Sequence, residues 1–287
     1  MRKAKPSSTA WEVALNLVAL GGKPGVNEVL PPGVVDTTAE LLVAAGIVGK
    51  ATLHVAQARG ILAVYDALDF MMPGQFEAFA HRKAFCERQV REGIAAGATQ
   101  VLLLGAGYDT LAYRLAPEFP SVAFIEIDHP ATSHLKARGI ERLGQPRNLH
   151  LIAEDLGERA PTGALEGPGP WDQRAQSVVV AEGLLMYLPP PAPSQLFERC
   201  AAVTGEGSRI AFTYVGTRDD GRPDAGPWTK HLLWMFHAGG EPWLWSIRPE
   251  EIALFLESTG WTSDPELCRD PHRHGVEYYG VAMRRAA

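Results

Sequence analysis

Apolar residues recur at intervals of three and four through the first hundred residues, which is typical of amphipathic helices. The pattern runs through residues 9–20, 37–69 and 74–97. Gly and Pro pairs separate these segments, and Ser8 or Thr9 is placed to cap the first helix. The sequence therefore predicts an N-terminal helical cap over residues 1–97, which we expect to fold within the same domain as the rest.

The pattern changes at Thr99, where short runs of β-branched and other apolar residues begin. Five such runs cover residues 99–104, 121–127, 148–153, 176–181 and 208–215. Segments long enough for helices lie between several of them, at residues 109–119, 130–144 and 192–205. Continuous apolar strands that alternate with helices predict an α/β fold, a mostly parallel sheet with helices on both faces.

The C-terminal third contains a segment that fits neither a strand nor a simple crossover helix. It covers residues 216–248 and holds Trp228, Trp234, Trp243 and Trp245. It is either a lid over the carboxyl edge of the sheet or a flap that fills a hydrophobic gap. A helix over residues 248–261 and a final strand over 275–285 follow, while residues 161–175 are predicted to form a surface loop. Residues 98–287 would thus form a core that carries this lid.

Composition excludes several classes of function. The net charge of −6 and the pI near 5.9 argue against broad electrostatic binding to nucleic acid or to a membrane surface. The three cysteines, Cys86, Cys200 and Cys268, are too far apart for a zinc ribbon or a disulfide framework. Glu12 and Asn16 interrupt the apolar start where a signal peptide would be uniform, so we expect a cytoplasmic protein. His272 and His274 lack a third ligand at a recognisable spacing, so no metal site is expected.

The first predicted strand runs directly into Gly105-Ala106-Gly107. Gly105 and Gly107 match the first two glycines of the dinucleotide-binding fingerprint, but Thr110 stands at the position of the third. That glycine permits the close packing of helix and strand around a pyrophosphate. Its absence weakens an NAD site, although two glycines after a strand still allow a ligand to lie against the backbone.

Acidic residues follow four successive predicted strands. They are Asp109, Asp128, Asp155 and Glu182, with Glu126 as an alternative to Asp128 because the register cannot be fixed from sequence. Ligands of open α/β sheets bind at the carboxyl ends of the strands. An edge lined with carboxylates suits a ligand with hydroxyl, amine and cationic groups better than a pyrophosphate. S-adenosylmethionine has these groups and no phosphate.

In this order, the segments VLLLGAGYDTLAYRL, IEIDHPATSHLK, AEDL and AEGLLMYLPP resemble the leucine carboxyl methyltransferase family. The resemblance covers roughly residues 8–215 and includes HRKAF in the helical cap. It implies a Rossmann-like class I methyltransferase with a seven-stranded sheet and S-adenosylmethionine as cofactor. It also implies transfer of a methyl group to an oxygen atom, most simply to a small-molecule carboxylate.

The resemblance further implies a role for individual residues. Arg82 would hold the carboxylate of the cofactor's methionine portion, and Gly105 and Gly107 would line that portion. Asp109, one of the strand-end acids, is also predicted to bind the cofactor. Asp128 would bind the ribose, Asp155 with Leu156 would frame the adenine, and Glu182 would face the amino-acid end. Relatives often have Arg at the position of Leu111, a departure for which Arg114 is placed to compensate.

Transfer to a carboxylate needs no general base, because the nucleophile is already ionised. If the acceptor were a hydroxyl, a base would help, and Tyr187, His129, His231 and His237 are candidates. The tryptophans suggest an apolar or aromatic acceptor, and a small molecule is favoured over a protein. Two alternatives stay open: an NAD-dependent oxidoreductase, and a module that binds S-adenosylmethionine without catalysis.

Overall fold

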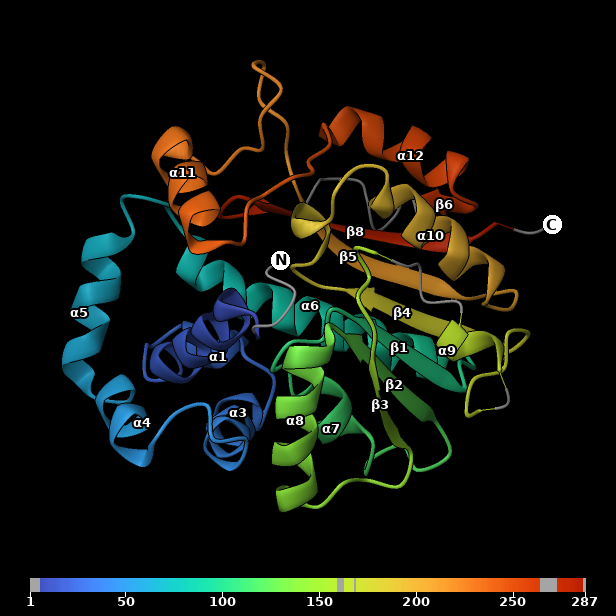
Figure 1. The fold of residues 1–287 in the computed structure, drawn as a ribbon, viewed down its shortest axis with the longest axis horizontal. Coiled ribbons are helices and arrows are strands. Elements are labelled where there is room, and N and C mark those ends of the chain that lie inside the picture. The colour runs from blue at the N-terminus through green and yellow to red at the C-terminus, as the bar shows by residue number, and fades with distance from the viewer. Residues whose placement is uncertain (1–5, 159–162, 168, 264–272, 286–287) are drawn as a thin grey trace.

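A single mixed sheet forms the centre of the molecule (Figure 1). The computed structural model describes residues 6–158, 163–167, 169–263 and 273–285. Five strands pair in parallel: β1 (Gln100–Leu104), β2 (Ala123–Asp128), β3 (Leu149–Ala153), β4 (Ser177–Ala181) and β5 (Arg209–Val215). The described strands follow the order β3-β2-β1-β4-β5-β8-β6. The strand order reverses between β1 and β4, and this switch point is where open α/β sheets bind ligands.

Three short or antiparallel strands complete the sheet. They are β8 (Glu277–Arg284), which runs antiparallel to β5, and β6 (Trp261–Ser263) and β7 (Arg273–His274), which both pair with β8. The predicted class, a mostly parallel sheet with helices on both faces, is confirmed. Seven strands lie along the main path, and β7 brings the described sheet to eight.

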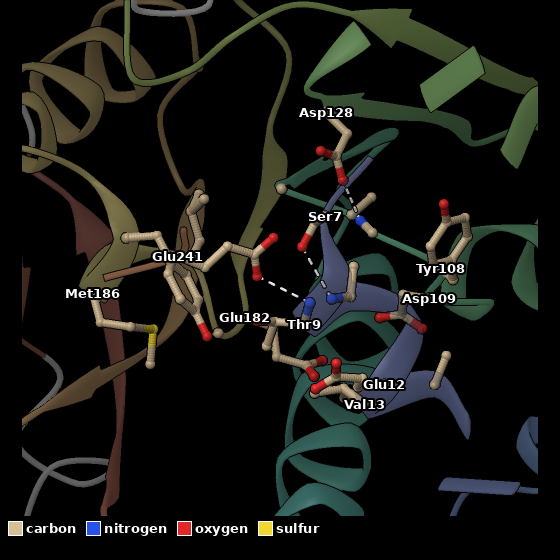
Figure 2. Close-up of a pocket in the computed structure, with 18 of the residues that line it drawn as sticks. Ser7, Thr9, Glu12, Val13, Tyr108, Asp109, Asp128, Glu182, Met186 and Glu241 are labelled. Atoms are coloured by element: carbon tan, nitrogen blue, oxygen red, sulfur yellow. Dashed lines mark hydrogen bonds between the residues drawn. The ribbon is translucent and has the colours of Figure 1, made fainter. Parts of the chain in front are cut away.

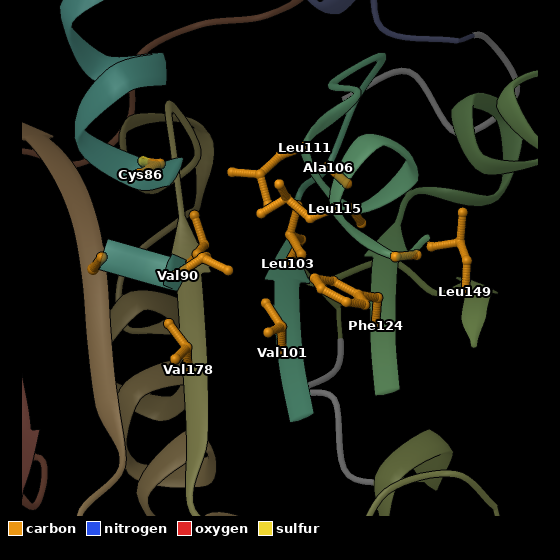
Figure 3. Packing of buried hydrophobic residues seen from close by; sticks show 14 of the residues in the cluster. Cys86, Val90, Val101, Leu103, Ala106, Leu111, Leu115, Phe124, Leu149 and Val178 are labelled. Atoms are coloured by element: carbon orange, nitrogen blue, oxygen red, sulfur yellow. The ribbon is translucent and has the colours of Figure 1, made fainter. Parts of the chain in front are cut away.

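The two faces of the sheet are covered by different helices, as the alternation along each strand requires. Val101 and Leu103 of β1 face helices α6 (Gln75–Ala95), α7 (Leu111–Leu115) and α8 (Pro130–Leu143) (Figure 3). Leu102 and Leu104 face the opposite cluster, which includes residues of α9 (Gly163–Glu166), α10 (Ala192–Ala202) and α12 (Ile252–Ser258). Strands buried on both faces explain why β1 and β4 are apolar after their first residues, Gln100 and Ser177.

The segment before β1 is helical, as predicted, but with more interruptions. Its remaining helices are α1 (Ser8–Leu20), α2 (Val26–Val29), α3 (Val34–Ala44), α4 (Lys50–Ala56) and α5 (Arg59–Leu68). The N-cap of α1 is Ser7 rather than Ser8 or Thr9, because its side chain accepts a hydrogen bond from the amide of Ala10 at 3.0 Å. Residues of α1, α3 and α6 share one buried cluster with the sheet strands.

Three predicted elements differ from those observed. The helix predicted over 248–261 divides into a 3-10 turn, η2 (Pro249–Glu251), and α12, and Trp261 lies in β6 instead. The predicted surface loop contains the short helix α9. The Trp-rich segment contains a full helix, α11 (Thr229–Gly239). In addition, a 3-10 turn, η1 (Leu185–Tyr187), follows β4.

Other expectations concern cysteines, metals and membranes. Cys86 and Cys200 are buried free thiols, while Cys268 and His272 lie outside the described residues. His274 stacks on His81 with ring centroids 3.9 Å apart. Within the described ranges, no three metal-ligating side chains come together. No helix in that same part of the chain combines the length and apolarity needed to cross a bilayer.

Candidate functional site

A cavity of about 480 Å³ lies at the carboxyl ends of β1 to β4 (Figure 2). Its floor is formed by the turns that follow these strands, and α1, α6 and the segment after α11 close its sides. All eight residues predicted to bind a cofactor line it: Arg82, Gly105, Gly107, Asp109, Asp128, Asp155, Leu156 and Glu182. Residues dispersed over a hundred positions are therefore gathered at the switch point of the sheet.

The two glycines after β1 adopt conformations that other residues rarely adopt. Gly105 has φ +62° and Gly107 has φ +47°. A Cβ atom on Gly105 would lie 2.7 Å from Leu184 Cδ1, and one on Gly107 would lie 3.3 Å from Ala10 Cβ. The glycines are thus needed to turn the chain beneath α1, which packs directly over this turn.

Asp128, at the end of β2, accepts hydrogen bonds on both carboxylate oxygens. The amide of Gly107 donates to Oδ2, and the amide of His129 donates to Oδ1 at 2.5 Å. Burial raises the pKa of Asp128 above its ordinary value, although both amide hydrogen bonds act in the opposite direction. A carboxylate has about four acceptor positions, so Asp128 keeps capacity for the hydroxyls of a ligand.

Glu126, the alternative to Asp128, does not line the cavity. It lies on the same buried face of β2 as Phe124, and Lys136 Nζ of α8 pairs with its Oε2 at 2.6 Å. Both side chains are buried, and burial raises the pKa of Glu126. The structure thus places Asp128 at the cavity and Glu126 in a separate buried ion pair.

Five buried charged side chains form a network at the centre of the cavity wall. Arg82 Nε lies 2.9 Å from Glu182 Oε1, and Arg82 Nη1 lies 2.6 Å from Glu277 Oε1. Lys83 Nζ lies 2.9 Å from Asp109 Oδ2 and 2.7 Å from Glu182 Oε1. Three carboxylates therefore face two cations.

The protonation states of the network follow from these contacts. Burial would lower the pKa of Arg82 and Lys83, but the adjacent carboxylates raise both above their ordinary values. Burial would raise the pKa of Asp109, but Lys83 and Lys136 hold it well below its usual range. The formal charges of the three carboxylates and two cations sum to one negative charge. Glu182 Oε2 and Glu277 Oε2 are buried and have no hydrogen-bond partner among the described residues.

Arg82 therefore differs from the simple clamp that the resemblance implies. Its guanidinium lines the cavity but already contacts two carboxylates. A ligand carboxylate could reach it only by sharing the guanidinium with Glu182 and Glu277. Lys83 and Glu277 were not predicted as site residues. The sequence offers only a weak indication for Lys83: it is the neighbour of Arg82, a predicted site residue, on the helix before the first strand.

Asp155 and Leu156 follow β3 at the other end of the cavity. Asp155 Oδ1 accepts a hydrogen bond from the amide of Gly157 at 2.9 Å, and Oδ2 lies 3.7 Å from His129 Nε2. Leu156 is buried beside them. The Asp155 carboxylate can accept a hydrogen bond from the edge of a flat heterocycle, and the Leu156 side chain offers an apolar surface to its face.

The four residues considered as bases have different positions. Tyr187 and His129 line the cavity, whereas His231 and His237 are exposed on α11 and do not. Burial raises the pKa of Tyr187 to about 12, so its hydroxyl is protonated at neutral pH. His129 is the N-cap of α8, and its Nδ1 accepts from the amide of Ala131 at 3.3 Å.

The Trp-rich segment contributes fewer tryptophans to the cavity than the sequence suggested. Trp243 lines it and packs on Phe236 at 5.0 Å between ring centroids. Trp245 packs into the core against Phe255, and Trp228 and Trp234 are exposed. The segment thus serves both roles that were considered, as a cavity wall and as a packing flap.

The segment after α11 also holds α1 in place. The amides of Ser8 and Thr9 donate to Glu241 Oε1 and Oε2 at 2.8 and 2.9 Å. Figure 2 shows the bond from Thr9. A carboxylate at a helix N-terminus is stabilised by the free amides and by the helix dipole. Glu241 therefore links the two segments that cover the cavity.

Leu111 and Arg114 mark the departure from the family pattern. Leu111, the first residue of α7, is buried in the core, and its amide donates to Asp109 Oδ1 at 3.0 Å. Arg114 pairs with Glu87 at 2.6 Å and does not line the cavity, so it does not substitute there for a missing arginine. Lys83 instead supplies the cation next to Asp109.

The charge of the cavity is strongly one-sided. Besides the four acids after the strands, its described walls contain Glu12, Glu158, Glu241 and Glu277. The only lysine or arginine side chains among those lining residues are Arg82 and Lys83, and both are paired. A cavity with eight acids and two cations favours a ligand that carries positive charge.

The chain is similar to a known protein family and to named proteins of several bacteria. Residues 28–201 match the model of the leucine carboxyl methyltransferase family. Proteins of Mycobacterium bovis and Mycobacterium tuberculosis, named as candidate S-adenosyl-L-methionine-dependent methyltransferases, are 33% identical over 220 residues. These alignments include 73% of this chain and 61% of each relative. The chain thus spans about three fifths of the length of these relatives.

Solved structures support the fold. A candidate methyltransferase of Thermobifida fusca aligns with a TM-score of 0.60 at 20% identity, covering 92% of this chain and 98% of its own. A duf574 family protein of Streptomyces avermitilis aligns with a TM-score of 0.57 at 15% identity, covering 87% and 97%. At these identities the similarity concerns the fold.

Proposed function

The chain belongs to the leucine carboxyl methyltransferase family, and from this premise we propose that it transfers a methyl group from S-adenosylmethionine to an oxygen atom of a small molecule. The observation that carries the proposal is the single cavity that collects Asp109, Asp128, Asp155 and Glu182 from four strand ends. Relatives named for S-adenosylmethionine support the choice of cofactor.

The residues present fit this cofactor. The negative excess of the buried network and the unpartnered Glu182 Oε2 suit a ligand with an ammonium and a sulfonium. Asp128 keeps acceptor positions for ribose hydroxyls, and Asp155 with Leu156 suits the amino group and face of adenine. A pyrophosphate would meet these same carboxylates and be repelled, which counts against NAD.

When bound, the cofactor supplies an electrophilic methyl group on its sulfonium. The chain's own contribution is to orient the acceptor and exclude water. The covering helix α1 and the Glu241 segment perform that exclusion, because both lie over the strand ends. No covalent intermediate with the protein is required by this chemistry.

Two acceptor groups are candidates for the oxygen. The family resemblance favours a carboxylate, which would become a methyl ester. A carboxylate would have to share Arg82 or Lys83 with the acids that already pair with them. The excess of acids favours a hydroxyl instead, as a second candidate. In either case the apolar walls favour a small molecule over a protein segment.

Cofactor binding tests the proposal directly. Calorimetry should show binding of S-adenosylmethionine and S-adenosylhomocysteine and no binding of NAD. Asp128→Asn should weaken binding of both sulfur compounds about 10- to 100-fold, because charged hydrogen bonds contribute roughly 1.5–3 kcal/mol. The control is Asp36→Asn, an exposed acid on α3 outside the cavity, which should bind as the natural chain does.

Three results would contradict the proposal or part of it. Absence of S-adenosylmethionine binding would overturn the cofactor assignment, and tight NAD binding would favour an oxidoreductase. Unchanged affinity in Asp128→Asn would remove the ribose assignment. Binding without methylation of any acceptor, screened by mass spectrometry for a gain of one methyl group, would favour a non-catalytic binding module.

A further inference from the structure

Glu12 is a cavity residue that has no role in the binding of the cofactor described above. It lies on α1, whose side chains at three- and four-residue intervals line the cavity: Thr9, Glu12, Val13, Asn16 and Leu17. This spacing places them on one face of the helix. Glu12 therefore faces the cavity from α1, which covers the turns after the strands (Figure 2).

Among the residues that the structure describes, no side chain binds the Glu12 carboxylate. Its polar neighbours on α1 are engaged: the amide of Thr9 donates to Glu241, and Asn16 Oδ1 accepts from the Tyr65 hydroxyl at 2.5 Å. For Glu12 itself, the described residues provide no hydrogen bond and no ion pair. Partial burial, and then the charge of Glu241, raise the pKa of Glu12 above its ordinary value.

Glu12 is exposed on α1, and the cavity that it lines also has apolar walls. The apolar lining residues of α1, α6 and the segment around α11 include Val13, Leu17, Phe76, Phe79, Phe236 and Trp243. Arg82 and Lys83 are both paired with carboxylates. An anionic acceptor in this region would meet Glu12 without a cation to offset the repulsion.

Glu241, the other acid near Glu12, is already satisfied. Both of its carboxylate oxygens accept amide hydrogen bonds from the start of α1. The two acids therefore do not form a paired site for a cation. Glu12 remains as a single carboxylate that can accept a proton.

We propose that Glu12 is the general base for a hydroxyl acceptor, which makes the substrate class a small apolar phenol or alcohol rather than a carboxylic acid. This inference rests on the proposed function. In the step, the acceptor O–H proton passes to a Glu12 carboxylate oxygen as the acceptor oxygen bonds to the methyl carbon. The carbon–sulfur bond breaks with its electron pair on sulfur, which leaves a neutral thioether and a protonated Glu12.

A pair of probes with the same ring system separates the two acceptor classes: 2-naphthol and 2-naphthoic acid. The natural chain, saturated with S-adenosylmethionine, should methylate 2-naphthol in preference to 2-naphthoic acid. Glu12→Gln should lower kcat for 2-naphthol about 100-fold near neutral pH, the usual contribution of a general base. The matched control is Glu28→Gln, the same change at an exposed residue of α2 outside the cavity.

The pH profile distinguishes a base from a merely structural residue. In the natural chain, kcat should rise with pH as Glu12 loses its proton and then reach a plateau. In Glu12→Gln that rise should disappear, and the residual rate should instead increase at high pH as 2-naphthol itself ionises. A uniform decrease with an unchanged profile would overturn the proposal.

Binding provides a readout that does not need turnover. With S-adenosylhomocysteine bound, Glu12→Gln should bind 2-naphthoate about tenfold more tightly than the natural chain, because one repulsive charge is removed. Unchanged 2-naphthoate affinity, failure of the natural chain to bind either probe, or preferential methylation of 2-naphthoic acid would each overturn the role of Glu12. The affinity of Glu12→Gln for S-adenosylmethionine, measured by calorimetry, should equal that of the natural chain. If the natural chain did not bind S-adenosylmethionine, the proposed function itself would be overturned.

Discussion

At the scale of single residues, Asp109 couples the candidate site to the stability of the chain. It is buried, and burial alone would raise its pKa; Lys83 at 2.9 Å, Lys136 and the Leu111 amide lower it overall. A carboxyl whose pKa is depressed in the folded state stabilises the fold above its unfolded pKa. That stabilisation is lost as the pH falls through the folded pKa.

Asp109→Asn should therefore lower the free energy of unfolding by about 3 kcal/mol at pH 7, because it leaves Lys83 without one of its two partners. The difference from the natural chain should diminish below about pH 4, where the unfolded carboxyl becomes protonated. Urea denaturation between pH 3 and pH 7 measures this. As a control, Asp66→Asn removes an exposed partner of Lys23 and should change stability by less than about 1 kcal/mol. A difference for Asp109→Asn that stays constant with pH would contradict the ion-pair account.

The same residue shows what sequence reasoning could reach. Asp109, Asp128, Asp155 and Glu182 were predictable as neighbours, because carboxyl ends of parallel strands share an edge. The pairing of Asp109 with Lys83 was not, since it depends on how α6 is rotated against the sheet. Glu12 was noticed only as an interruption of an apolar run; its exposure to the cavity depends on where α1 packs.

At the scale of elements, two helix ends were missed because they depend on glycines, and the pattern of hydrophobic residues contains no information about backbone conformation. Gly46, with φ +73°, lies just after α3 and divides a segment that the pattern presents as continuous. Gly260, with φ +88°, follows α12, so Trp261 starts β6 and its Nε1 donates to the Phe197 carbonyl at 3.0 Å. Strands as short as β6 and β7 show too little alternation to be recognised.

The contact between α6 and β4 gives a prediction at this scale. A Cβ atom on Gly93 would lie 2.2 Å from Val178 Cγ2. Gly93→Ala should therefore lower the free energy of unfolding by about 1–3 kcal/mol, despite the better helix propensity of alanine. The double variant Gly93→Ala, Val178→Ala should recover part of that loss, because the clashing methyl group is gone. Thermal unfolding of both variants measures this, and a more stable Gly93→Ala would show that α6 is not packed this closely.

At the scale of the whole molecule, the cavity is bordered by segments that lie far apart in the sequence. The amides of Ser8 and Thr9 bind Glu241, and the amide of Ser7 donates to Thr132 Oγ1 at 3.1 Å. The start of α1 is thus attached to α8 on one side and to the segment after α11 on the other. We expect a ligand in the cavity to exchange more readily when these attachments open.

Glu241→Gln should therefore make ligand exchange faster. Loss of a charged cap contributes about 1 kcal/mol, so dissociation of S-adenosylhomocysteine should accelerate about fivefold. Hydrogen exchange of the Ser8 and Thr9 amides should also be faster, and S-adenosylhomocysteine should protect these amides in the natural chain. Glu250→Gln, an exposed acid in η2, is the matched control. If the ligand protected the strand ends but left α1 exchange unchanged, α1 would be a fixed wall, and entry would have to occur past the Glu241 segment alone.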